Sequence, residues 1–138
     1  MKQLFYTLLL FCFAGALQAQ NVSDEVRQLA QTVTDELADV YNLDDRQTAE
    51  MYRIQVRKYN NLQVIEGMRN DRDLYVKKMQ ALQTGTDGSI KLILEREQYA
   101  THQERLGNRR KARAIQTKIL TERGLSQEEI ELELLKVE

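Results

Sequence analysis

Residues 43–68 read LDDRQTAEMYRIQVRKYNNLQVIEGM, and this stretch decides the fold class of the chain. Its apolar and aromatic residues recur at helical spacing and form one broad face of a helix. Asp44 can accept a hydrogen bond from the helix start and Gln47 can reach back to it, which makes a capping box. Because the stretch lacks proline, we predict one long helix that runs to Arg69 unless Gly67 breaks it.

The segments on either side carry helix signals of the same kind. We predict a first helix that starts at the N-cap Ser23 and ends near residues 41–42, with a single apolar stripe between them. A third helical segment, 74–82, follows the turn-forming pair Asn70–Asp71. Residues 84–88 read TGTDG and form the one clear loop predicted by the sequence.

The last helix has well-defined start signals. Gly124 is a typical helix end, so the long polar helix before it should stop there. Ser126 and Glu129 then make a capping box, while Leu125 and Ile130 can pack together as a hydrophobic staple. Since the chain shows no alternation typical of strands, we predict an all-α protein of about four helices.

The N-terminus has the pattern of an export signal. Lys2 is followed by an apolar run over residues 4–17, which is shorter than the roughly 18 to 20 residues that span a bilayer. Small residues follow, so we place the cleavage after Ala19, with Ala16 as the alternative. A cleaved secretory signal peptide at residues 1–19 is therefore expected, before a single helical domain over residues 20–138.

Residues that perform catalysis or bind metals are scarce. Cys12 lies within the predicted signal, so the rest of the chain has no cysteine for a nucleophile, a ligand or a disulfide. His102 is the only histidine, and its charged neighbours favour a solvated surface position. A metal site needs several converging ligands. We therefore expect neither an enzyme nor a bound metal or cofactor.

Charge is distributed unevenly near the C-terminus. A basic strip consists of Arg105, Arg109, Arg110, Lys111 and Arg113. It could attract acidic stretches of unfolded proteins, or anionic envelope lipids and polymers. The acidic segment 128–138 follows it, so the two could instead pair within or between subunits, or remain a solvated face. Nucleic acid is not an expected partner, because the chain is predicted to be exported and aromatic residues do not interleave the strip.

Two segments share one pattern: residues 43–47 read LDDRQ and residues 94–98 read LEREQ. This pair resembles the paired LTxxQ motifs of the Spy/CpxP family of periplasmic helical proteins. The matching positions are Leu43, Asp44, Gln47, Leu94, Glu95 and Gln98. The resemblance implies long antiparallel helices in a thin, cradle-shaped homodimer. It also implies a role in ATP-independent chaperoning or envelope-stress signalling.

The chain departs from the family pattern at the second position of each motif. Asp44 and Glu95 stand where the family has threonine. Aspartate caps a helix equally well, whereas glutamate caps poorly, so we expect a continuous helix from Ser89 through the second motif. The metal-sensing branch of the family is disfavoured, because His102 stands alone.

The functional expectation is a periplasmic, chaperone-like binding protein that holds unfolded or envelope proteins loosely. Its apolar run is too short for stable membrane insertion. The alternative is a structural or regulatory envelope protein that docks one specific partner through a helix face. Breadth of binding distinguishes the two.

Overall fold

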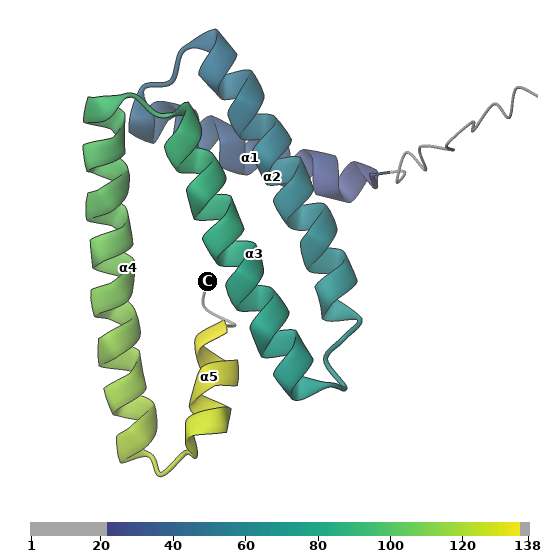
Figure 1. Cartoon of the computed structure of the whole chain (residues 1–138), viewed down its shortest axis with the longest axis vertical. Coiled ribbons are helices and arrows are strands. Elements are labelled where there is room, and N and C mark those ends of the chain that lie inside the picture. Colours follow the sequence, from purple (N-terminus) through teal and green to yellow (C-terminus); the bar gives the residue numbers. More distant parts are fainter. Residues whose placement is uncertain (1–21, 136–138) are drawn as a thin grey trace, which may run out of the picture.

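The computed structural model describes residues 22–135, which form five α-helices and no strand (Figure 1). The helices are α1 (Asp24–Tyr41), α2 (Asp45–Glu66), α3 (Arg72–Ile93), α4 (Arg96–Glu122) and α5 (Gln127–Leu135). The predicted all-α class is confirmed, with five helices instead of about four. The signal peptide predicted at residues 1–19 lies outside the described residues.

The first two helices begin where their caps predict. The hydroxyl of Ser23 accepts a hydrogen bond from the Val26 N–H at 3.2 Å, and α1 ends at Asn42 in the left-handed conformation. Asp44 Oδ1 accepts from the Gln47 N–H at 2.7 Å, while the Asp44 N–H donates to Gln47 Oε1 at 3.1 Å. The capping box at the start of α2 is therefore confirmed.

The loop predicted at residues 84–88 is wrong, because α3 runs through it without a break. Hydroxyl groups there bond inside the helix: Thr86 Oγ1 donates to the Leu82 carbonyl at 2.8 Å, and Ser89 Oγ donates to the Gly85 carbonyl at 2.8 Å. A helical glycine costs only about 1 kcal/mol. Packing of residues on both sides, such as Leu82 and Ile90, outweighs that cost.

The continuous helix expected from Ser89 onward is also wrong. Instead, α3 ends at Ile93, Leu94 adopts an extended conformation, and α4 begins at Arg96. The N–H of Glu95 donates to Gln98 Oε1 at 2.8 Å, so a side chain one turn into α4 satisfies the backbone at the break. The glutamine of the motif therefore supports this helix start.

The end of α4 and the start of α5 agree with the predictions. Gly124 has φ +82°, and the Leu125 N–H donates to the Leu120 carbonyl at 3.2 Å, which closes the helix end. The Ser126 N–H donates to Glu129 Oε2 at 2.8 Å, while Ser126 Oγ accepts from the Glu129 N–H at 3.3 Å. The predicted capping box at the start of α5 is confirmed.

Consecutive helices from α2 onward run antiparallel, and α1 crosses behind α2 and α3 (Figure 1). α4 descends from the upper end of α3, and α5 turns back upward between α4 and α3. Most of the buried apolar residues form three separate clusters instead of one continuous core. The upper cluster contains Tyr41, Met51, Ile54 and Ile90; the lower clusters contain Ile65, Tyr75 and Leu135, and Leu120, Ile130 and Leu134.

Candidate binding site

The two Leu-x-x-x-Gln segments meet at the upper end of the molecule. Gln47 Nε2 donates to Gln98 Oε1 at 2.8 Å, and Gln98 Nε2 donates to Gln47 Oε1 at 3.0 Å. Leu43 and Leu94 both pack against the upper apolar cluster beneath this pair. We call this contact the glutamine junction. It joins the start of α2 to the start of α4 across 51 residues of sequence.

Each glutamine of the junction also holds the end of a further helix. Gln47 Nε2 donates to the Ile93 carbonyl at 2.8 Å, where α3 ends. Gln98 Nε2 donates to the Asn42 carbonyl at 3.1 Å, where α1 ends. Together with the two cap bonds, both amide groups use all their donors and accept two bonds each. The junction therefore fixes four helix ends with no hydrogen-bonding capacity left over.

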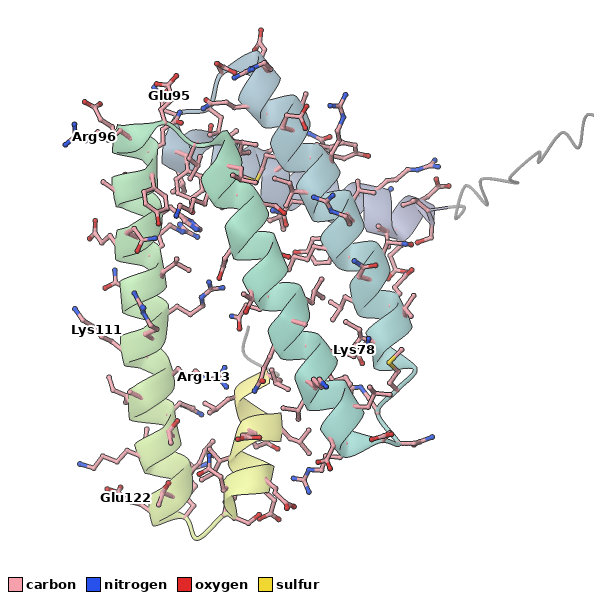
Figure 2. The ribbon with its side chains drawn as sticks, viewed as in Figure 1. Lys78, Glu95, Arg96, Lys111, Arg113 and Glu122 are labelled. Atoms are coloured by element: carbon pink, nitrogen blue, oxygen red, sulfur yellow. The ribbon has the colours of Figure 1, made fainter. Side chains whose placement is uncertain are left out.

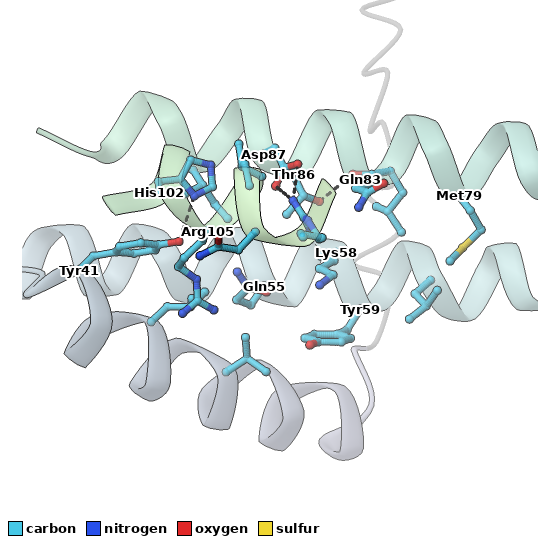
Figure 3. A pocket seen from close by; sticks show the side chains of 18 residues that line it. Tyr41, Gln55, Lys58, Tyr59, Met79, Gln83, Thr86, Asp87, His102 and Arg105 are labelled. Carbon is cyan, nitrogen blue, oxygen red and sulfur yellow. Dashed lines mark hydrogen bonds and ion pairs between the residues drawn. The ribbon is translucent and has the colours of Figure 1, made fainter. Parts of the chain in front are cut away.

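A pocket of about 630 Å³ opens below the junction, between α1, α2, α3 and α4 (Figure 3). Its surface is mostly apolar. The apolar and aromatic side chains that line it are Val33, Leu37, Tyr41, Tyr59, Leu62, Met79, Leu82, Ile90 and Leu106. A volume of this size falls within the range of small-molecule and peptide side-chain pockets.

The charged groups of the pocket are mostly cationic. Lys58, Arg105 and Arg109 line it, against the single carboxylate of Asp87. One terminal nitrogen of Arg109 donates to both Asp87 oxygens, at 2.8 and 3.1 Å. Arg105 lies over the ring of Tyr41, with its central carbon 5.9 Å from the ring centroid. The pocket therefore favours ligands that combine apolar groups with negative charge.

His102 is buried in the pocket wall, so the prediction of a solvated surface histidine is wrong. Only 4% of its surface is exposed, and its Nδ1 lies 3.0 Å from the hydroxyl of Tyr41. Burial lowers the pKa of His102, opposed by the carboxylate of Asp87. His102 lies one helical turn after Gln98 on the same face of α4, and this spacing was the sequence signal for its burial.

Two buried polar atoms in the pocket wall have no hydrogen-bond partner among residues 22–135. They are Oε1 of Gln55, on α2, and Nε2 of His102, on α4. The amide nitrogen of Gln55 makes only a 3.4 Å contact with the sulfur of Met51. Buried polar atoms of folded proteins are nearly always bonded, so each of these two atoms is an exception to that pattern. Both side chains line the pocket, although the two atoms themselves are shielded from solvent (Figure 3).

The structure divides the basic strip between different faces of α4. Arg105 and Arg109 line the pocket, and Arg113 follows four residues later on the same face. Lys111 is exposed and lies on the opposite side of the helix, while Arg110 is exposed on its flank. Figure 2 shows Lys111 pointing outward and Arg113 extending toward α5. The strip is therefore not one continuous surface.

Comparisons with family models, curated proteins and solved structures give no match to this chain. Within residues 22–135, no cluster of three or more His, Cys, Asp or Glu side chains has the geometry to hold a metal ion. None of the five described helices is long and apolar enough to cross a membrane. The pocket is thus characterised by its own geometry and chemistry.

Proposed function

We propose that the chain is an ATP-independent, chaperone-like binding protein of the Spy/CpxP type, which holds unfolded segments loosely in the pocket. The observation that carries the proposal is the pocket's lining: mostly apolar surface with three cations and one carboxylate. Unfolded proteins expose apolar side chains together with scattered charges. Such a lining suits them without requiring one particular sequence.

Two properties of the pocket support loose holding. Met79 and Tyr59 adapt their contacts to different partners, since methionine is flexible and tyrosine combines an apolar ring with a polar tip. Arg105 is exposed at the pocket, where it can attract acidic segments over a distance of several ångströms. Long-range attraction followed by apolar contact needs no nucleotide. A client can then leave as it folds and buries its own apolar surface.

The proposal also includes a cellular location and an oligomeric state. Residues 1–19 would direct export, and the remaining chain would act in the periplasm on unfolded or envelope proteins, without a cofactor and without enzymatic activity. A homodimer would place two pockets within reach of one client. This arrangement rests on the resemblance of the two motifs to the Spy/CpxP family.

One observation favours the alternative, docking of a single specific partner through a helix face. Ile115 and Ile119 lie one turn apart on α4, are 63% and 37% exposed, and do not line the pocket. Neighbouring exposed apolar residues on one helix are typical of helix-mediated contacts. A protein of this kind would bind one partner tightly and ignore unrelated ones.

Aggregation of unrelated clients tests the proposal. The chain beginning at Gln20 is mixed at equimolar ratio with either of two unfolding proteins, without ATP, and light scattering is followed. Suppression of both, with slower capture at higher salt, is the expected result. Suppression of neither contradicts the proposal, and suppression of one alone favours the alternative.

A matched pair of variants locates the effect on α4. Arg105→Gln and Lys111→Gln each remove one positive charge from α4, but of the two residues only Arg105 lines the pocket. We expect Arg105→Gln to slow client capture several-fold at low salt and Lys111→Gln to leave it unchanged. Equal effects of the two variants would show that net charge, and not the pocket, governs capture.

A further inference from the structure

The C-terminal helix α5 fills the lower part of the space between α3 and α4 (Figure 1). Its apolar residues face both sides. Leu132 and Leu135 belong to the cluster of Ile65 and Tyr75, on α2 and α3. Ile130 and Leu134 belong to the cluster of Leu120, on α4. The residues of α2, α3 and α4 in these two clusters form what we call the α5 seat.

The α5 seat and the pocket share residues. Met79 and Leu82 pack against the cluster that contains Leu135, and the same two side chains line the pocket. The apolar surface beneath α5 is therefore continuous with the apolar surface of the pocket. Removal of α5 would extend the pocket downward along α3 and α4 into one long groove.

The chemistry of α5 matches the charge of its surroundings. Residues 127–135 read QEEIELELL, with four glutamates among nine residues. Arg72 of α3 lies 3.4 Å from the carboxylate of Glu128, and it also helps to lower the pKa of Glu129, after the hydrogen bonds from Ser126. Arg113 extends from α4 toward α5 (Figure 2). The seat is thus occupied by an acidic, amphipathic segment.

α5 is held mainly by burial of its apolar side chains, since Ile130, Leu134 and Leu135 are only 2%, 6% and 8% exposed. A helix of nine residues is too short to be stable alone, since isolated helices below about 12 to 15 residues are marginal in water. Its helicity therefore depends on docking. Its ion pair with Arg72 is exposed to solvent, and such pairs contribute little. An undocked α5 would be a tail that combines acidic and apolar residues. Client segments are proposed to combine the same two kinds of residue.

We infer that the α5 seat is a binding groove for acidic amphipathic segments of client proteins, and that α5 is its built-in competitor. The inference rests on the proposed function, and it names the class of client segment. A segment of alternating acidic and apolar residues displaces α5, takes its place on α3 and α4, and reaches the pocket through Met79 and Leu82. Segments of other chemistry bind in the pocket alone and leave α5 docked.

A labelled peptide with the sequence of residues 125–135 tests the inference by fluorescence anisotropy. Its binding is compared between the unaltered chain and the double variant Ile130→Ser/Leu134→Ser, which undocks α5. We expect at least tenfold tighter binding to the variant. The control variant Val40→Ser/Leu92→Ser changes two exposed apolar residues outside the pocket and the α5 seat, so it should bind the peptide as the unaltered chain does.

Charge is tested with a second peptide in which lysine replaces the glutamates. It should bind the undocked variant at least tenfold more weakly at low salt. Equal binding of the peptide to all chains, or equal binding of both peptides, would overturn the inference.

Hydrogen exchange on the unaltered chain gives a test that does not depend on the variant's folding. Excess acidic peptide should accelerate exchange of the amides of residues 127–135, because α5 leaves its seat. Unchanged exchange at saturating peptide would overturn the inference. A chain that suppresses aggregation but fails both peptide tests keeps the proposed function and loses this inference. A chain that passes the peptide tests without suppressing aggregation loses only the chaperone proposal.

Discussion

The glutamine junction and the pocket both bury glutamine, but they treat its amide group in opposite ways. At the junction, Gln47 and Gln98 bond to each other, to their own helix starts and to the ends of α3 and α1. In the pocket wall, Gln55 is only 1% exposed, and its carbonyl oxygen has no partner among the described residues. The difference separates a structural element from a candidate binding element.

Desolvation explains why this difference matters. A buried polar group costs free energy unless a hydrogen bond replaces its contact with water. The junction meets that condition fully, so it holds one arrangement of helix ends. The pocket does not meet it at Gln55 or His102. A bound segment could recover this free energy only if Gln55 or His102 moved, because neither unpartnered atom is exposed to solvent in the folded chain.

The largest effect is expected from Gln47→Leu. The Gln98 side-chain oxygen and the Ile93 carbonyl then lose the donor that Gln47 supplies. The Asp44 N–H loses its acceptor. We expect a loss of about 2–4 kcal/mol in the free energy of unfolding, measured with urea. The same substitution at the exposed Gln80 should change it by less than about 0.5 kcal/mol.

A double-mutant cycle sharpens this prediction. Because Gln47 and Gln98 bond to each other, Gln98→Leu should cost clearly less in the Gln47→Leu background than in the unaltered chain. Strictly additive losses would mean that the two glutamines act independently, and the junction would then not be a single unit.

The second effect is a dependence of stability on pH. Burial lowers the pKa of His102 in the folded chain; Arg105 and Arg109 add to the effect and Asp87 opposes it. The unfolded chain takes up the proton near its ordinary pKa of 6.5, before the folded chain does. Stability is therefore fully present above pH 6.5 and falls as the pH drops below it, by at most about 1.4 kcal/mol per pH unit.

The variant His102→Gln isolates this contribution. Urea unfolding between pH 7 and pH 5 should show a shallower loss of stability in the variant than in the unaltered chain. An identical slope in both would mean that His102 is not held neutral by burial, and that other groups cause the loss.

The smallest effect, and the opposite of the first, is expected from Gln55→Leu. Leucine removes the unpartnered oxygen and fills a similar volume with an apolar side chain. The free energy of unfolding should therefore stay equal or rise by up to about 1 kcal/mol. Client capture should weaken in the same variant. A loss of stability as large as that of Gln47→Leu would remove the distinction between the two regions.

The sequence predicted the elements with local signals and missed those that depend on tertiary packing. The caps at Ser23, Asp44 and Ser126 act within one turn, so their residue types alone placed three helix starts. Gly85 and Gly88 suggested a loop, but packing of α3 outweighs the cost of two helical glycines.

The candidate site was predicted only in part. The two Leu-x-x-x-Gln segments were visible because they repeat, although their contact across the fold was not. His102 was misjudged because its neighbours in sequence are charged, whereas its neighbours in space are Tyr41 and Tyr99. The pocket itself is lined by residues of four helices that are distant in sequence, so no local pattern encodes it.

The central claim is that clients bind at the pocket and leave the glutamine junction unchanged. Nuclear magnetic resonance tests it directly through the side-chain signals of Gln47, Gln98, Gln55 and His102 during titration with an unfolded client segment. We predict that the signals of Gln55 and His102 shift with client concentration while those of Gln47 and Gln98 stay in place. Shifts at Gln47 and Gln98 alone, or no shift at Gln55 and His102 at saturation, would contradict the account.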